Sequence, residues 1–165
     1  MISKSLFTSD HVELLHELLK LDTVSPMETG RVSEIMTAQT LYANFAAERT
    51  PCKVVHHAPP HPRLLQNEAI PLSVQERAEE MGKAFWESQP SMVLLIGEQR
   101  LLEETVMFNF HMDTVEGSFP VSYEREIFVG RGAVDMKGAG VALLAGIQSA
   151  LAEEPDLLDD LSILI

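Results

Sequence analysis

Cysteine is almost absent from the sequence, with Cys52 the only one among 165 residues. A single cysteine excludes an intrachain disulfide, which fits a reducing compartment. Because Cys52 stands just before the apolar pair Val54 and Val55, we interpret it as a packing residue and not as a nucleophile.

Basic residues and long hydrophobic runs are also scarce. The sequence has 12 basic against 25 acidic residues and a formal net charge of −13. Phosphate backbones and anionic lipids would repel such a chain, which argues against nucleic-acid and membrane-surface partners. No apolar run approaches the ~20 residues of a membrane span, and the first residues lack the apolar core of a signal peptide. We therefore expect a cytoplasmic protein.

The apolar pattern that is present predicts an α/β fold. The segments "SMVLLIG" and "TVMFNF" are continuously apolar, which is typical of central strands covered on both faces. Alternation of such strands with helices predicts a layered, mixed, mostly parallel sheet flanked by helices. Leucines at helical spacing and an almost entirely apolar later segment predict the main helices. The predicted helices are 10–21, 32–49, 73–88 and 136–154, and the predicted strands are 52–57, 91–97, 105–110, 123–130 and 161–165.

The last residue, Ile165, falls inside a predicted core strand. A strand at that position would lack its turn and its return connection. We therefore expect residues 1–165 to be the N-terminal portion of a longer protein.

The stretch "MFNFHMDTVEG" ends an apolar run in His111 and Asp113. If the strand stays extended, these two side chains share a face and Met112 points the other way. Ligand sites of open α/β sheets gather at strand ends. A neutral imidazole is a good zinc ligand, and a nearby carboxylate can orient it. The alternative is that both residues only close the strand and bond to local backbone.

The stretch "VGRGAVDMKGAG" places Asp135 directly before the apolar helix 136–154. As a structural residue, Asp135 would be the N-cap of that helix. A glycine-rich phosphate loop is the rival reading, but Asp135 stands where its third glycine should be and would repel a pyrophosphate. A metal ion, in contrast, would favour this carboxylate. Three histidines of "HHAPPHP", His56, His57 and His61, lie in a proline-rich segment without fixed geometry, so we do not assign them a metal site.

Together, "HMDTV" and the later "GRGAVDMKG" resemble the signature of the acetylornithine deacetylase, succinyl-diaminopimelate desuccinylase, aminoacylase and glutamate carboxypeptidase family of zinc metallopeptidases. "LLKLDTVSP" and "LSILI" resemble the loop after that family's first helix and a later strand. By position, His111 matches a metal ligand, Asp113 the catalytic-site aspartate that holds its imidazole, and Asp135 the carboxylate that bridges two metals. Arg131 would brace the loop that delivers Asp135.

This resemblance implies a zinc-peptidase-like catalytic domain with two zinc ions, cobalt or manganese being alternatives. The implied reaction is hydrolysis of an amide in an N-acyl amino acid or small peptide that has a free carboxylate. It also implies a homodimer formed through a smaller lid domain that residues 1–165 do not contain.

The chain departs from this family in what it lacks. The family needs a Glu-Glu pair that supplies the general base, a further acidic ligand and a late histidine. Glu153 and Glu154 cannot substitute, because they stand at the wrong end of the helix. A smaller departure is that Gly138 is followed by Ala139 and Gly140, where two adjacent glycines are common. The second hypothesis is therefore a truncated or degenerate fragment that keeps the fold, binds metal weakly or not at all, and does not turn over substrate alone.

Overall fold

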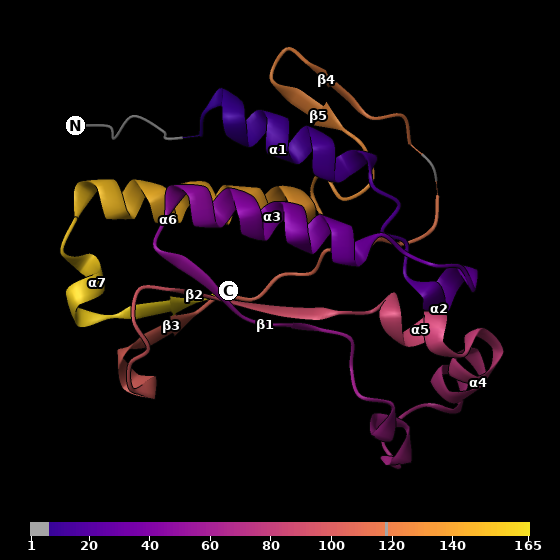
Figure 1. Cartoon of the computed structure of the whole chain (residues 1–165). Coiled ribbons are helices and arrows are strands. Elements are labelled where there is room, and N and C mark those ends of the chain that lie inside the picture. Colours follow the sequence, from indigo (N-terminus) through magenta and orange to yellow (C-terminus); the bar gives the residue numbers. More distant parts are fainter. Residues whose placement is uncertain (1–6, 118) are drawn as a thin grey trace.

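A four-stranded sheet forms the base of the molecule (Figure 1). The structure is a computed structural model that describes residues 7–117 and 119–165. The strand order is β1-β2-β6-β3, and a separate two-stranded hairpin, β4-β5, lies above the first helix. The strands are β1 (Cys52–Ala58), β2 (Ser91–Ile96), β3 (Thr105–Met107), β4 (Ser122–Glu124), β5 (Ile127–Val129) and β6 (Ser162–Leu164).

The sheet is mixed, as predicted, but it is not mostly parallel. Strand β2 pairs antiparallel with both β1 and β6, and only β3 and β6 run parallel. The β3–β6 pair has the long crossover connection that parallel strands need, and its helix is α6 (Lys137–Glu153). The prediction was wrong because a continuous apolar run reports burial and not the direction of the neighbouring strand.

Three long helices lie on one side of the sheet. Helices α3 and α6 cover that face, and α1 lies above them (Figure 1). The predicted helices are confirmed with shifted bounds, except that 73–88 is broken into two at Gly82, where φ is +59°. The remaining helices are α1 (Ser9–Lys20), α2 (Pro26–Thr29), α3 (Ile35–Arg49), α4 (Leu72–Met81), α5 (Lys83–Glu87), α7 (Leu157–Asp160) and the 3-10 turns η1 (Pro62–Gln66) and η2 (Leu102–Glu104).

The main core lies between the helices and the upper face of the sheet. Leu18, Tyr42, Leu94 and Leu144 are completely buried there. Cys52 packs against this core and its extension around Ile96, and burial raises the pKa of its thiol, as expected for a packing residue.

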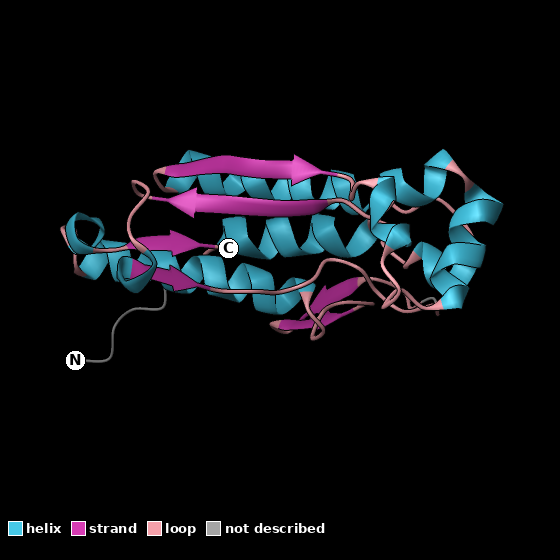
Figure 2. Cartoon of the chain, turned by 90° about the horizontal axis from the view of Figure 1, so that it is seen from below, coloured by secondary structure: helices cyan, strands magenta, loops and turns pink. Residues whose placement is uncertain are grey.

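The lower face of the sheet carries no helix within the described residues, as Figure 2 shows from below. Exposed apolar residues include Val55 on β1 (54% exposed) and Met107 on β3 (74%). Coverage of the central strands on both faces is therefore not observed in this part of the chain. No helix in the described part of the chain has both the length and the apolar character needed to cross a membrane.

The segment predicted as one strand over 123–130 is instead the hairpin β4-β5. Its turn residues Arg125 and Glu126 have φ values of +51° and +65°. Two consecutive positive φ angles are the geometry of a type I′ turn, which matches the twist of a tight hairpin. The prediction missed this turn because it contains no glycine or asparagine.

Candidate metal site

His111 lies four residues past Met107, the last residue of β3, where the chain has left the ladder. The last ladder bond runs from the Phe108 N–H to the Leu164 carbonyl at 2.9 Å. Met112 is 5% exposed and belongs to the main core, whereas the His111 and Asp113 side chains are 45% and 49% exposed. The alternation expected for an extended segment therefore holds without a partner strand.

His111 and Asp135 meet across a gap of 24 residues in the sequence. The His111 Nε2 atom lies 3.1 Å from Asp135 Oδ1. On the other side of the ring, Nδ1 lies 2.9 Å from the Asp113 backbone oxygen and 3.4 Å from its carboxylate. The motif predicted that the Asp113 carboxylate holds the imidazole. The main-chain carbonyl of Asp113 is instead the closer partner of the ring.

Both ring nitrogens of His111 therefore face oxygen acceptors. A neutral imidazole carries one N–H and can donate to only one of them. A second proton on the ring, or a cation between Nε2 and Oδ1, would satisfy both contacts. The pair is suited in this way to bind a cation.

Asp135 is not the N-cap of α6. The capping residue is Met136, whose side chain makes no hydrogen bond to the first turn. The Asp135 carboxylate is 80% exposed and contacts His111 instead. The peptide bond between Asp135 and Met136 is cis. The capping interpretation of Asp135 is therefore wrong, and its side chain is directed toward the site.

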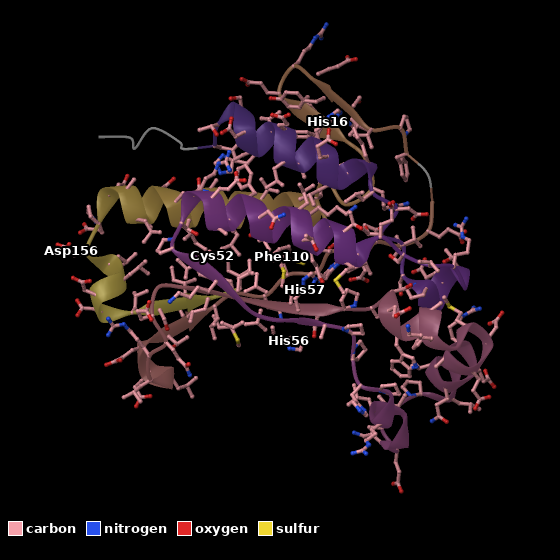
Figure 3. The ribbon with its side chains drawn as sticks, in the orientation of Figure 1. His16, Cys52, His56, His57, Phe110 and Asp156 are labelled. Atoms are coloured by element: carbon pink, nitrogen blue, oxygen red, sulfur yellow. The ribbon has the colours of Figure 1, made fainter. Side chains whose placement is uncertain are left out.

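The segment that carries His111 packs closely on the first turn of α6. A Cβ added at Gly140 would lie 2.3 Å from the Phe110 ring. Tyr42 of α3 donates its hydroxyl to the Gly140 carbonyl at 2.9 Å, and its ring centroid lies 5.2 Å from that of Phe110. Figure 3 labels Phe110 between the helices and the sheet. Burial raises the pKa of the Tyr42 phenol, so it stays a hydrogen-bond donor.

The loop after α1 is joined to the strand end beside the site. The Thr114 N–H donates to the Thr23 carbonyl at 2.9 Å, and the Ser25 N–H donates to the Thr114 carbonyl at 3.0 Å. Thr23 and Thr114 are both buried. Sequence reasoning gave no role to these threonines, because the contact joins residues 91 positions apart.

Lys137 is a third residue that sequence reasoning missed. It opens α6, is 1% exposed, and its Nζ donates to the carbonyls of Leu18 (2.8 Å) and Leu21 (3.2 Å). Burial lowers the pKa of Lys137 to about 8, against the opposing influence of the nearby carboxylates Asp22 and Glu34. The signals in the sequence were a lysine at the start of an apolar helix and its place in the motif "GRGAVDMKG".

A pocket of about 410 Å³ opens beside His111, Asp113 and Asp135. Arg131 and Phe119 also line it. The Arg131 guanidinium donates to the Glu116 carbonyl at 3.2 Å and lies 4.7 Å from the Phe119 ring centroid. These contacts agree with the expected bracing role for Arg131.

His111 and Asp135 have the right donor types for zinc but are only two in number. Among residues 7–117 and 119–165, no group of three or more His, Cys, Asp or Glu side chains is placed to hold a metal ion. Catalytic zinc sites use three protein ligands. The imidazole nitrogen and the carboxylate thus fit part of a zinc site.

The histidines of β1 do not add a second site. His57 Nε2 lies 3.0 Å from Gln39 Oε1 of α3, and His56 Nε2 lies 3.1 Å from Ser91 Oγ. Figure 3 shows His57 on the helical side of β1 and His56 on the opposite side. Each ring thus bonds to its own polar neighbour.

Comparison with known proteins gives a match to a protein family. Residues 107–165 match the model of Peptidase family M20/M25/M40. The matched segment contains His111, Asp113 and Asp135, and it suggests a metal-dependent hydrolase. No curated protein matches the chain.

Proposed function

We propose that this chain forms part of the catalytic domain of a metal-dependent amide hydrolase. The observation that carries the proposal is the 3.1 Å approach of His111 Nε2 to Asp135 Oδ1. Both residues lie in the segment that matches the peptidase family. Residues of two separate sequence motifs need not meet in space, but two ligands of one metal centre must.

In this proposal His111 and Asp135 hold zinc, with cobalt or manganese as alternatives, and Asp135 is shared between two ions. When bound, such ions lower the pKa of a water molecule and polarise a scissile carbonyl. Further ligands and the general base would come from protein segments outside these 165 residues, because no three such ligands gather among the described residues. Residues 1–165 would then be the N-terminal portion of the catalytic domain.

Asp113 serves the site by orienting the imidazole. Its backbone oxygen and carboxylate lie 2.9 and 3.4 Å from Nδ1, so with a metal ion on Nε2 either acceptor would hold the remaining N–H proton on Nδ1. The lone pair of Nε2 then points toward Asp135, which is the tautomer that a metal ligand requires.

The proposed substrate is an N-acyl amino acid or a small peptide with a free carboxylate. The pocket beside the site has apolar walls that include Phe119 and Val134, and Arg131, which braces the Glu116 carbonyl, adds positive charge to the same wall. Apolar walls with a few polar groups are typical of small-molecule sites. An acyl chain and a carboxylate are the groups that such a lining accommodates.

A second candidate is a fragment that keeps the fold without catalysis. The count of two ligands favours it, because two donors cannot complete a four-coordinate zinc site. On this reading the chain binds metal weakly and does not turn over substrate by itself.

The test of catalysis is amide hydrolysis by the protein that contains this chain. N-acetyl amino acids are assayed with added zinc, cobalt or manganese. We expect His111→Ala and Asp135→Ala to reduce the rate to background. The control variant is His56→Ala, because His56 is an exposed histidine on β1, and it should leave the rate unchanged. Full activity in either site variant would refute the proposal.

Calorimetric zinc titration of the 165-residue chain tests the two-ligand count on which both candidates rest. We expect weak binding that is abolished by either site variant. Tight, stoichiometric uptake of two ions by the chain alone would contradict the two-ligand count.

A further inference from the structure

The geometry points to Lys137 as a positioning residue: its ammonium group anchors the loop that carries Asp135 to the end of α1, and thereby keeps Asp135 within reach of His111. Lys137 lies two residues beyond Asp135 and is 1% exposed. Its Nζ donates to the Leu18 and Leu21 carbonyls at 2.8 and 3.2 Å. These carbonyls belong to the last turn and the cap of α1.

The end of α1 is a suitable anchor for a cation. The final carbonyls of a helix lack intrahelical donors, and the helix dipole makes this end negative. The carboxylates of Asp22 and Glu34 add negative potential around Lys137. A buried ammonium group thus finds both hydrogen-bond acceptors and compensating charge at this position.

The local position of Lys137 in its own helix is unfavourable. It is the first residue of α6, where the positive end of the helix dipole repels a cation, and burial of lysine is rare without such partners. Neither the preference of residues for the start of a helix nor the solvation of the ammonium group accounts for a lysine at this position. Its hydrogen-bond acceptors come from the end of α1, and the compensating carboxylates come from Asp22 in the loop that follows and from Glu34 at the N-cap of α3.

The stem of Lys137 fills the inside of the Asp135 loop. A Cβ added at Gly132 would lie 3.0 Å from Lys137 Cδ and 3.2 Å from Cγ. The Gly138 N–H donates to the Gly132 carbonyl at 3.2 Å, which closes the loop around the stem. Asp135 lies between these two glycines, so release of the ammonium group frees the segment that places its carboxylate.

The first test measures the loop without any metal. Lys137→Met keeps the stem and removes the ammonium group. We expect amide exchange at Ala133 and Gly138, which bond within the loop, to accelerate by about tenfold or more relative to Leu94 in the sheet. Lys20→Met is the matched control, because Lys20 is an exposed lysine of α1 paired with Glu17 at 2.6 Å. Equal acceleration at all amides would mean a merely structural role and would overturn the inference.

The second test reads the site itself. Nitrogen spectra of the His111 ring report its two hydrogen-bond partners, and we expect them to change in Lys137→Met and to stay unchanged in Lys20→Met. An unchanged His111 spectrum together with unchanged loop exchange would refute the positioning role.

The single native cysteine permits a chemical rescue. In a Cys52→Ala background, Lys137→Cys is alkylated in the unfolded state and refolded, either with an aminoethyl group, which restores the ammonium, or with a neutral propyl group of similar length. We expect amide exchange in the loop to be native only with the aminoethyl group. This comparison remains valid even if Lys137→Met does not fold. Native exchange with the propyl group would overturn the inference.

The consequence for metal binding rests on the proposed function. In the protein that contains this chain, Lys137→Met should weaken zinc binding and Lys20→Met should not. If the loop opens but even the unmodified protein binds no zinc, the proposed function fails and the positioning role stands. If zinc binds equally well to the unmodified protein and to Lys137→Met, and the loop is unchanged, the positioning role fails and the proposed function stands.

Discussion

Gly140→Ala should destabilise the protein, although alanine is the stronger helix former. Gly140 is in α6, and a Cβ at this position would lie 2.3, 2.7 and 2.8 Å from three atoms of the Phe110 ring. Ordinary carbon contacts begin near 3.5 Å. The ring would have to move by roughly 1 Å, and the packed ring of Tyr42, whose centroid is 5.2 Å away, limits that movement.

The same helix contains a matched control. A Cβ at Gly146 would meet nothing within 4 Å, so Gly146→Ala should stabilise the protein by about 1 kcal/mol through helix propensity alone. At Gly140 the same gain is opposed by overpacking, which costs about 1–3 kcal/mol. The difference between the two variants is therefore expected to be about 1–3 kcal/mol, with Gly140→Ala the less stable.

Urea unfolding followed by far-UV circular dichroism measures both variants. The double variant Gly140→Ala with Phe110→Leu should recover part of the loss, because leucine removes the ring atoms that clash. Equal stabilisation by Gly140→Ala and Gly146→Ala would refute the reasoning. It would mean that Phe110 moves freely and does not fix the segment that carries His111.

Two further predictions concern buried polar groups. Tyr42→Phe removes the 2.9 Å bond to the Gly140 carbonyl and should cost about 1 kcal/mol in urea unfolding; an unchanged midpoint would contradict this bond. His11 is 2% exposed, and burial chiefly lowers its pKa below 6.5; Gln148 and Asp10 oppose this effect, and Arg49 adds to it. Between this lowered pKa and 6.5 the unfolded chain binds more protons than the folded one. The contribution of neutral His11 to the free energy of unfolding is therefore fully present above pH 6.5. This contribution is lost as the pH falls, by at most about 1.4 kcal/mol per pH unit. Protonation also removes the acceptor Nδ1 of the bond from the Thr8 N–H, at 3.1 Å. The slope between pH 5 and 7 should decrease in His11→Gln, and an identical slope in that variant would exclude His11 as its source.

The sequence was most informative where the chemistry is local. His111 and Asp135 were proposed from short motifs, and the fold brings their side chains together. The helices and most strands were predicted from periodicity and apolar runs. Strand direction was not, because the antiparallel pairing of β2 with β1 and β6 depends on where distant segments return to the sheet.

The residues around the site were harder to predict, because their roles depend on tertiary partners. Lys137 acts on carbonyls of Leu18 and Leu21, more than a hundred positions away. Thr23 and Thr114 are ordinary loop residues until the chain places them in contact. A side chain whose function is to join two segments leaves no periodic or spacing signal in either segment.

The apparent departure at Ala139 has a structural explanation. The resembling family often has two adjacent glycines after its lysine, whereas this chain has Gly138, Ala139 and Gly140. A Cβ at Gly138 would lie 1.9 Å from the Ala133 backbone oxygen, and one at Gly140 would meet Phe110, while Ala139 is exposed. The positions that must lack a side chain are therefore 138 and 140. Gly138 leaves room for the loop that carries Asp135, and Gly140 leaves room for the segment that carries His111. Both segments approach the first turn of α6 at distances that a methyl group would prevent, so the relative position of His111 and Asp135 depends on two glycines and not on an adjacent pair.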